Sequence, residues 1–317
     1  MANEHPLFRS TEVKSLASET RISRQQSMLW IGSCFVESMV PFLTDFQYRF
    51  VSNPFGVVFN PMIISQLLQK TDLELSLANF EKEGVWMNFW LGSPFYDKTE
   101  NELTEQIREA KLLAKDEVEK ADWLILTWGT AFWYEHHQAG IVGKCHKLPQ
   151  ALFEKKKHSV EEIVSDYQTL IQELRKANPK LKILLTVSPV RHTRDGLEAN
   201  AVSKSTLRLA AELLKNSVSG VFYFPAYEIM IDELRDYRFY ESDLVHPNHL
   251  AIGYIWEQFG LQYFSESDRE VNLLMKRIQI QKQHRPLASF GLQFEKWQAD
   301  LKRKETELEI HLSNALK

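Results

Sequence analysis

Short apolar runs that alternate with longer amphipathic segments constrain the fold of this chain more than any other feature. Four runs have the length and the flanking residues of buried strands: Ser27–Gly32, Trp123–Trp128, Lys182–Val187 and Val221–Phe224. Strands of a parallel sheet that is covered on both faces are nearly continuous hydrophobic runs, and the segments between them supply the covering helices. The pattern therefore predicts a three-layer α/β/α fold around a parallel sheet.

Apolar residues at helical spacing mark the covering segments. Residues 102–120 and 159–177 both place apolar side chains three or four positions apart. Ser159 and Glu162 form a capping-box pattern at the start of the second segment, and Pro179 ends it. The same reasoning predicts a strand over residues 47–51 and helices over residues 34–43, 203–216 and 250–264.

Composition excludes several classes of function. The chain has 317 residues, of which 44% are apolar and 25% charged, and its net charge is -4. This balance gives no electrostatic reason to bind nucleic acid or an anionic membrane. Residues 1–9 lack the pattern of a signal peptide, and no apolar run reaches the ~18 residues that span a bilayer. Two cysteines are too few for a disulfide framework, which is compatible with a reducing compartment. Together with the missing signal-peptide pattern, this count predicts a cytoplasmic protein.

The character of the chain changes after about residue 265. Residues 287–316 predict one long helix that carries an apolar stripe, with Pro286 at its beginning. We therefore divide the chain into a main domain, residues 1–265, and a helical C-terminal extension, residues 266–317. The stripe either packs back on the main domain or forms a homo-oligomer contact.

A serine stands where the first predicted strand gives way to a helix. Gly32 ends the strand, Ser33 follows it, and Cys34 opens the helical stretch. Backbone N–H groups and the positive end of a helix dipole converge at such a point, where they stabilise a developing oxyanion. Most Gly-Ser pairs are only turns and helix caps, and a serine hydroxyl needs a general base to act as a nucleophile.

The chain supplies such a base far downstream. Asp243 and His246 lie three residues apart in a loop that contains Pro247 and precedes an apolar helix. A carboxylate beside an imidazole fixes its tautomer and stabilises the imidazolium that forms when the imidazole takes a proton. Ser33, Asp243 and His246 in this order predict an acyl-transfer site at the carboxyl ends of the strands.

These residues also carry a family resemblance. Gly32-Ser33-Cys34-Phe35 resembles the signature of the GSCFA family, a branch of the SGNH (GDSL-like) hydrolases, and Asp243-x-x-His246-Pro247-Asn248 resembles the SGNH block with the catalytic aspartate and histidine. Further stretches resemble GSCFA sequences at residues 53–56, 127–131, 145–149 and 188–192. The resemblance implies a flavodoxin-like sheet and a serine esterase that needs no cofactor or metal.

The same resemblance implies an oxyanion site. By position it assigns Ser33 as the nucleophile and first donor, His246 as the base and Asp243 as its partner, with the Gly56 N–H as the second oxyanion donor. Many SGNH enzymes use an asparagine as the third donor, but here Gly129 is followed by Thr130 and Ala131. The substitute we predict is the Thr130 hydroxyl or a nearby backbone N–H, and loss of a donor costs about 10² to 10³ in turnover.

Substrate contacts are predicted from residue type and position. Arg191 and His192 end a central strand, where they can hold an anionic or hydroxyl-rich substrate, the guanidinium by a bidentate grip, or can pair instead with Asp195 or Glu198. We also assign Trp128 and His146 to the cleft. Cys34 beside Ser33 is the alternative nucleophile, although cysteine is more often a buried small hydrophobe.

A metal site is the competing chemistry. His136, His137, Cys145 and His146 offer four potential ligands within eleven residues, and zinc with an open position can activate water. Adjacent histidines point apart on most backbones, and the spacing is irregular for a metal motif, so we favour a loop that lines the cleft.

Two functions follow from these residues. The first is a serine hydrolase that cleaves an acyl ester of a small molecule or glycan, such as an O-acetylated carbohydrate, through an acyl-serine intermediate. The second is a ligand-binding protein on the same scaffold with little or no turnover, which the missing asparagine donor favours.

Overall fold

The centre of the molecule is a five-stranded parallel sheet in the order β11-β10-β6-β1-β2. The computed structural model describes residues 11–13, 17–284 and 286–315, so residues 1–9, on which the signal-peptide prediction rests, lie outside it. The strands are β1 (Ser27–Gly32), β2 (Arg49–Ser52), β6 (Trp123–Trp128), β10 (Lys182–Val187) and β11 (Val221–Phe224). The predicted α/β fold is confirmed, and only β2 differs from its predicted bounds.

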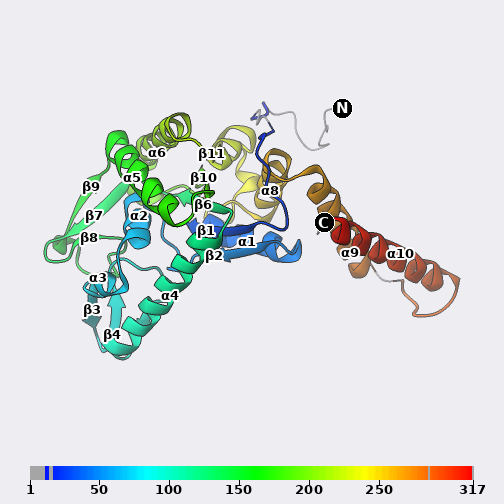
Figure 1. Ribbon diagram of the computed structural model, residues 1–317, viewed down its shortest axis with the longest axis horizontal. Coiled ribbons are helices and arrows are strands. Elements are labelled where there is room, and N and C mark those ends of the chain that lie inside the picture. The colour runs from blue at the N-terminus through cyan, green and yellow to red at the C-terminus, as the bar shows by residue number, and fades with distance from the viewer. Residues whose placement is uncertain (1–10, 14–16, 285, 316–317) are drawn as a thin grey trace.

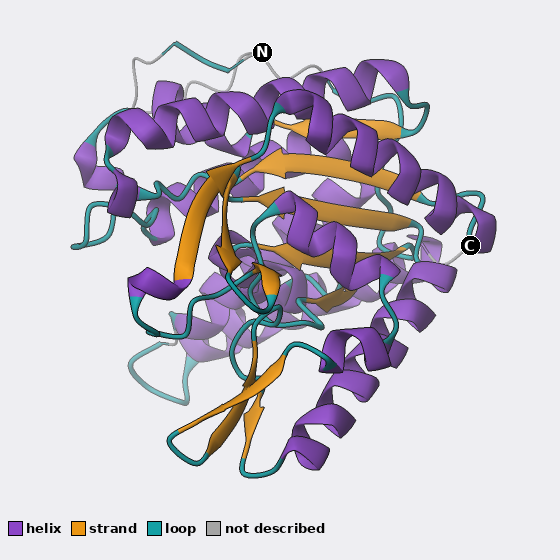
Figure 2. Cartoon of the chain, turned by 90° about the vertical axis from the view of Figure 1, so that its left-hand side faces the viewer, coloured by secondary structure: helices purple, strands orange, loops and turns teal. Residues whose placement is uncertain are grey.

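Helices cover both faces of this sheet, as Figures 1 and 2 show. One face carries α1 (Cys34–Asp45) and α8 (His249–Tyr263), and the other carries α2 (Pro61–Gln69), α4 (Glu100–Lys120), α5 (Val160–Ala177) and α6 (Leu197–Ser217). In β1, Leu29 and Ile31 join the core beneath the second group, whereas Met28 and Trp30 join the core beneath α1 and α8. Successive side chains of a strand point to opposite faces, which explains the uninterrupted apolar runs.

Helix caps confirm some predicted boundaries and correct others. The Ser159 side chain accepts from the Glu162 N–H, and the Glu162 side chain accepts from the Ser159 N–H, so the predicted capping box is present. The helix predicted to begin at residue 203 begins six residues earlier, at Leu197, because Gly196, with φ of 85°, turns the chain without a side-chain cap. A start without a capping side chain leaves no sequence signal.

Two small antiparallel sheets were not predicted. One contains β3 (Asn79–Lys82), β4 (Val85–Asn88) and β5 (Tyr96–Asp97); the other contains β7 (Phe132–His136), β8 (Gly140–Val142) and β9 (Phe153–Lys157). A two-residue loop with positive φ at Glu83 and Gly84 joins β3 to β4, as a type I′ turn requires. These strands are short and partly polar, so neither their hydrophobic periodicity nor their composition identifies them as strands. α3 (Asp72–Ser76) precedes β3.

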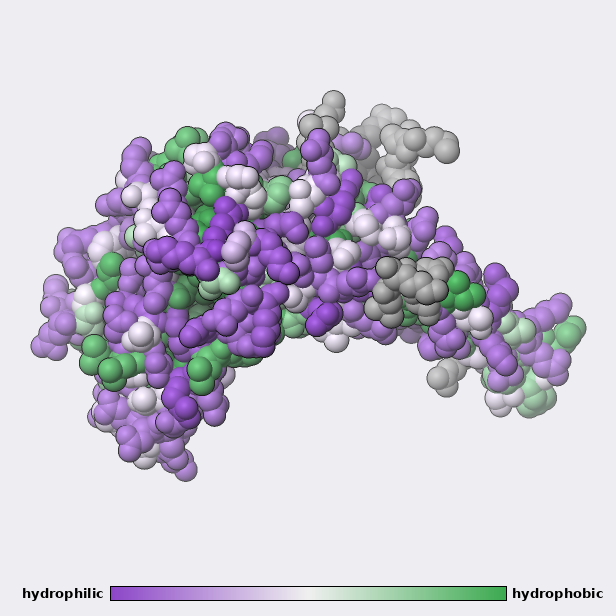
Figure 3. All heavy atoms as spheres, in the orientation of Figure 1, coloured by the Kyte–Doolittle hydropathy of each residue, from purple (hydrophilic) through white to green (hydrophobic). Residues whose placement is uncertain are grey.

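The C-terminal segment forms two helices. The second confirms the helix predicted over residues 287–316, although it begins at Leu292 rather than beside Pro286, and the first lies before that range, where no separate helix was predicted. They are α9 (Glu266–Gln283) and α10 (Leu292–Ala315), which extend from the body in Figure 1. Gln281 and Trp297 exchange two side-chain-to-carbonyl hydrogen bonds of 3.1 and 3.2 Å, so α10 folds back along α9. The exposed residues Leu287, Phe290 and Leu292 lie in and beside the connection, and Figure 3 shows hydrophobic surface at this outer end.

α9 nevertheless packs into the hydrophobic core of the main domain. Its Val271 and Met275 belong to the cluster beneath α1 and α8, and Leu308 and Leu312 of α10 pack against the same cluster. The predicted division after residue 265 stays a prediction, as does self-association through α10. Among the residues that the structure describes, no helix is long and apolar enough to cross a membrane.

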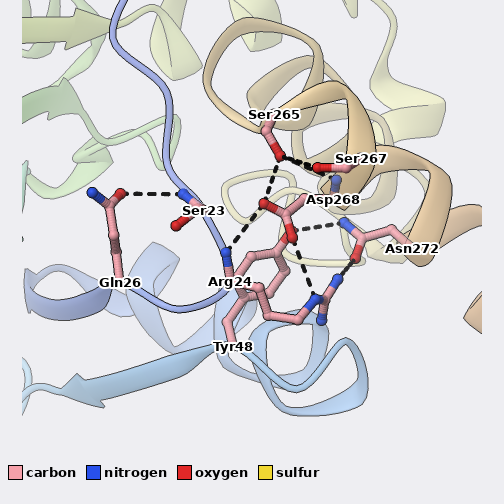
Figure 4. Close-up of polar contacts among 8 residues, drawn as sticks. All are labelled: Ser23, Arg24, Gln26, Tyr48, Ser265, Ser267, Asp268 and Asn272. Atoms are coloured by element: carbon pink, nitrogen blue, oxygen red, sulfur yellow. Dashed lines mark hydrogen bonds and ion pairs between the residues drawn. The ribbon is translucent and has the colours of Figure 1, made fainter. Parts of the chain in front are cut away.

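A buried polar network joins the beginning of the fold to α9 (Figure 4). Asp268 accepts from the Arg24 backbone N–H at 3.1 Å and from the Ser265 hydroxyl at 2.7 Å, and it pairs with the Arg24 guanidinium at 3.4 Å. That guanidinium also donates to Asn272 at 2.6 Å and lies over the Tyr48 ring. Arg24 and Asp268 are both buried, so each charge compensates the cost of removing the other from water.

Replacing Asp268 with alanine should lower the free energy of unfolding by about 3–5 kcal/mol, because it leaves the Arg24 charge buried without its partner. A urea titration measures the change as a lower midpoint. Asp300→Ala is the control, since Asp300 pairs with Arg303 and Lys304 on the exposed α10 and should leave the midpoint nearly unchanged. Equal midpoints for both variants would contradict the importance of the network.

Candidate active site

Ser33 caps the first helix of the fold. Gly32 ends β1, and a Cβ at that position would lie 2.5 Å from the Thr127 carbonyl oxygen, so glycine lets β1 and β6 approach. Ser33 is extended, with φ of -70° and ψ of 176°, and its Oγ accepts from the Phe35 N–H at 3.3 Å. The predicted position at a helix N-terminus is confirmed. The Phe35 N–H is one of the first-turn N–H groups that have no acceptor within a helix, and it points to the hydroxyl.

Asp243 and His246 form the predicted contact in the loop before α8. His246 Nδ1 lies 2.6 Å from Asp243 Oδ2, while Oδ1 accepts from the N–H groups of Val245 at 2.8 Å and of His246 at 3.0 Å. The backbone bond from His246, followed by its side-chain bond and the bond from Val245, lowers the pKa of Asp243 to about 2. The carboxylate is therefore ionised near neutral pH and holds Nδ1 as a donor, which leaves Nε2 as an acceptor.

One pocket of about 670 Å³ brings the two segments together. Ser33 and Cys34 line it from the start of α1, and Val245 and His246 line it from the loop before α8. Its remaining lining residues come from loops at the carboxyl ends of the strands: Phe59, Gly129, Ser188, Val190, Arg191, His192, Thr193 and Arg194. The hydroxyl of Ser33 lies 2.9 Å from Ser188 Oγ and donates there rather than to His246.

Two residues beside Ser33 were not among the predicted site residues. Ser188 follows β10 directly and is 1% exposed. Lys204 on α6 is also 1% exposed, and its Nζ donates to the Ser188 carbonyl at 2.7 Å. The sequence did contain a signal for a buried Lys204. This lysine shares a helical face with Leu207, Ala211 and Leu214, and a lysine on an apolar face is unusual.

The sequence confirms the family that these motifs suggested. A model of the GSCFA family matches residues 27–259, which include Ser33, Asp243 and His246. The chain belongs to the GSCFA family. No curated protein matches the chain in sequence.

Several solved structures resemble this GSCFA chain at low identity. A carbohydrate esterase family 3 protein from Talaromyces cellulolyticus is 9% identical, with a TM-score of 0.37 over 80% of this chain and 99% of the other. A putative platelet activating factor from Streptococcus pneumonia is 12% identical, with a TM-score of 0.37 over 75% and 84%. A family two carbohydrate esterase from Clostridium thermocellum is 12% identical, with a TM-score of 0.35 over 77% and 64%.

The predicted oxyanion donors of this GSCFA chain are engaged in the protein. The Ser33 N–H donates to the Thr127 carbonyl over a long 3.3 Å, and the Gly56 N–H closes a turn onto the Asn53 carbonyl at 2.8 Å. The Thr130 hydroxyl bonds with Ser203 at 3.1 Å and accepts from the Phe132 N–H. Neither Gly56 nor Thr130 lines the pocket of Ser33, so their role as donors stays a prediction that requires these bonds to open.

Gly56 has a clear structural reason to be glycine. Its φ is +68°, and a Cβ there would lie 2.5 Å from the Ser93 carbonyl oxygen and 2.9 Å from the carbonyl carbon of Gly92. The residue therefore permits a left-handed turn and a close backbone approach.

The predicted substrate residues divide into two groups. Arg191 and His192 line the pocket with Ser33. His192 Nδ1 lies 4.0 Å from Asp195 Oδ2, as the alternative prediction allowed. Arg191 instead donates to the Leu244 carbonyl and lies over the rings of Tyr237 and Tyr240. This contact ties the loop after β10 to the loop that carries Asp243 and His246.

Trp128 and His146 correct the other half of that prediction. Trp128 is 0% exposed, and its indole N–H donates to the Tyr167 hydroxyl at 3.0 Å, so it belongs to the core. His146 bonds to the Asn88 carbonyl at 2.8 Å, and burial lowers its pKa. Neither residue lines the pocket of Ser33.

The four residues considered for a metal site make separate contacts. His136 Nδ1 accepts from the Ala139 N–H at 3.1 Å, and His137 bonds to the Ala151 carbonyl at 3.0 Å. His146 bonds elsewhere, as described above, and Cys145 is a free thiol. Within the described part of the chain, no three His, Cys, Asp or Glu side chains are grouped to hold a metal ion.

A second pocket of about 710 Å³ adjoins the first one. Phe59, His192 and Arg194 line both pockets. Its other walls come from the loop after β6, from β7 and from the segment around Cys145. The sheet of β7, β8 and β9 thus extends the hollow beside Ser33.

Proposed function

We propose that this GSCFA protein is an SGNH-type serine hydrolase that cleaves an acyl ester through an acyl-serine intermediate. The observation that carries the proposal is a single pocket lined by the helix-capping Ser33 and by His246, whose imidazole is already bonded to Asp243 at 2.6 Å. A nucleophile, a base and an orienting carboxylate are the parts that acyl transfer to serine requires.

Acylation begins with a change of hydrogen-bond partner. In the resting protein the Ser33 proton points to Ser188, so the hydroxyl first turns toward His246 Nε2. His246 takes the proton as Ser33 Oγ attacks the acyl carbon, and Asp243 stabilises the imidazolium. The oxyanion forms at the N-terminus of α1, where the helix dipole and the first-turn N–H groups favour negative charge.

Release of product follows from the same groups. His246 returns the proton to the leaving alcohol, which frees the alcohol and leaves the acyl group on Ser33. Water then attacks the acyl carbon while His246 accepts its proton, and the serine is regenerated. None of these steps needs a cofactor.

The walls of the two pockets suggest the class of ester. Arg191, Arg194 and His192 provide polar and cationic groups, whereas Phe59 and Val190 provide apolar contact. A polar alcohol with a small acyl group, such as an O-acetylated carbohydrate, suits this mixture better than a long lipid chain, which needs a mainly apolar cavity.

Burst kinetics test the proposal. With excess p-nitrophenyl acetate, the protein should release one equivalent of p-nitrophenol in a burst when deacylation is slower than acylation. A fluorophosphonate should label Ser33, and intact-mass analysis followed by peptide mapping should locate the adduct. Panels of acetylated sugars and longer-chain esters then define the substrate. Wild-type protein that shows neither turnover nor labelling would remove the hydrolase proposal.

A binding protein on this scaffold is the second candidate. The engaged N–H groups of Ser33 and Gly56 favour it, because an oxyanion gains little from donors that already have acceptors. A ligand that binds only the native state raises the melting temperature. An acetylated glycan that raises the melting temperature without being cleaved would support this function against the hydrolase.

A further inference from the structure

The hydroxyl of Ser188 lies against the proposed nucleophile. Ser188 Oγ is 2.9 Å from Ser33 Oγ and also accepts from the Val190 N–H at 3.3 Å. Both serines are buried and both line the same pocket. A hydroxyl can accept one hydrogen bond while it donates another, so Ser188 retains a proton to donate.

Lys204 brings a positive charge to the other side of the Ser188 peptide group. Its Nζ donates to the Ser188 carbonyl at 2.7 Å and lies 5.6 Å from the centre of the Tyr227 ring. In the described residues no carboxylate is within ion-pair distance of this ammonium. A buried charge without a counter-ion is costly, and burial lowers the pKa of Lys204 to about 7.

We propose that Ser188 and Lys204 form a second set of groups that act on Ser33, in addition to Asp243 and His246. Ser188 is a catalytic residue that holds the resting nucleophile and then donates to the oxyanion. Lys204 is a positioning residue that fixes the Ser188 peptide group and places positive charge beneath the pocket. This inference rests on the proposed function, since it assigns roles in acyl transfer by Ser33.

Ser188 is better placed than the predicted oxyanion donors to contact an oxyanion formed at Ser33. The Gly56 N–H and the Thr130 hydroxyl are bonded elsewhere and lie outside the pocket, whereas Ser188 is within it. The oxygen of a tetrahedral intermediate lies one carbon atom away from the attacking oxygen. A hydroxyl in contact with Ser33 Oγ therefore reaches the oxyanion by rotation of its side chain.

The reaction balances with these groups. The Ser33 O–H bond breaks, its proton passes to His246 Nε2, and the freed electron pair forms the bond to the acyl carbon. The carbonyl π pair moves onto the carbonyl oxygen, and Ser188 turns to donate to that oxygen without losing its proton. On collapse the pair re-forms the carbonyl, the bond to the alcohol oxygen breaks, and the alcohol leaves with the proton from His246.

Other titratable groups lie near Lys204, and each bears on the pH dependence. Cys34 on α1, His192 after β10 and Tyr227 on α7 (Ala226–Glu228) face it, and Lys155, Arg194 and Asp195 lie around His192. Burial, and after it the charge of Lys204, lowers the pKa of His192. The Lys204 charge is complete well below pH 7 and is lost as the pH rises through about 7.

The first test is Ser188→Ala. We expect kcat for p-nitrophenyl acetate to fall about 10²- to 10³-fold with little change in KM, because the lost contact forms mainly in the transition state. Ser65→Ala is the matched control: Ser65 is a fully buried serine on α2 that bonds to Gln69, and its loss should not change kcat. Circular dichroism and melting temperature show that both variants fold.

The second test is Lys204→Met, which keeps an unbranched apolar side chain as far as Cε and removes the ammonium group. We expect a loss in kcat/KM on the order of tenfold at pH 6.5, and a weaker decline in rate between pH 6.5 and 8 than the wild type shows. Lys111→Met is the control, since Lys111 also donates to backbone carbonyls, at 2.8 and 2.7 Å, but on the side of α2 and α4. It should keep the wild-type pH profile.

The outcomes separate this inference from the proposed function. If wild-type protein is labelled and active through Ser33 while Ser188→Ala keeps the wild-type kcat, the inference alone is wrong. A Lys204→Met variant with the wild-type pH profile and rate also overturns it. If the wild type neither hydrolyses the ester nor reacts with a fluorophosphonate, both the proposed function and this inference are wrong.

Discussion

Ser33→Ala should lower kcat for ester hydrolysis by about 10⁴- to 10⁶-fold and abolish labelling by a fluorophosphonate. The substitution removes the atom that would form the covalent bond, and within the described part of the chain Ser33 Oγ makes two hydrogen bonds, with Ser188 and with the Phe35 N–H. Losing the cap contact to Phe35 costs helix α1 about 1 kcal/mol, which a protein of this size tolerates. The measurement is single-turnover and steady-state release of p-nitrophenol.

Cys34 is the alternative to Ser33 as the nucleophile. It follows Ser33 in the sequence and lines the same pocket. Burial raises the pKa of its thiol, which disfavours the reactive thiolate. We therefore expect Cys34→Ala to retain labelling and most of its turnover. If instead Cys34→Ala removes hydrolysis while Ser33→Ala keeps it, the nucleophile is Cys34.

Asp243→Asn should lower kcat by about 10⁴-fold while leaving the loop in place. Asparagine keeps an oxygen that can accept from the Val245 and His246 N–H groups, as Asp243 Oδ1 does. Its amide nitrogen cannot accept from His246 Nδ1, so the imidazole loses the partner that holds it with Nε2 free to take a proton. Steady-state kinetics over a range of pH measure the effect.

A nearby carboxylate supplies the control. Asp236 accepts from the Arg238 N–H at 2.9 Å in the same exposed region, and Asp236→Asn keeps that kind of contact. It should leave kcat within about threefold of the wild type, as a surface substitution away from the chemistry does. Equal losses in both variants would mean that Asp243 only shapes the loop.

The pH profile distinguishes the two members of the pair. Hydrogen bonds lower the pKa of Asp243 to about 2, so its favourable contribution is present above its ordinary unfolded value and is lost only as the pH falls through about 2. A loss of rate on acidification that begins well above pH 2 therefore does not come from protonation of Asp243. The activity should return fully when the pH is raised again.

Most of the central fold was predictable because its signals are local. The runs at β1, β6, β10 and β11 are short, apolar and bounded by polar or glycine residues, and the structure confirms their bounds. The small sheets were not predictable in this way, since the mostly charged β9 pairs with the aromatic β7 across residues 132–157. Their strands are stabilised by partners in space rather than by a periodic pattern.

The site was predictable only in its reactive groups. A serine at a strand-to-helix junction and an Asp-x-x-His pair are recognisable types at recognisable spacing. The assignment of Trp128 to the cleft failed because a strand alternates its faces, and this indole points into the core toward Tyr167. Hydrogen-bond donors depend on loop conformation, which is why the state of the Gly56 N–H was not visible in the sequence.

The sequence alone determined the elements whose causes lie within a few residues of one another. These are the apolar strands, the capping box at Ser159, the helix start at Ser33 and the bond between Asp243 and His246. Only the tertiary structure decided which of them meet. Ser188 reaches Ser33 because the parallel strands β1 and β10 end at the same edge of the sheet, and Lys204 reaches the Ser188 carbonyl because α6 packs beside β10. Contacts between residues more than 150 positions apart depend on the packing of layers, which no local pattern encodes.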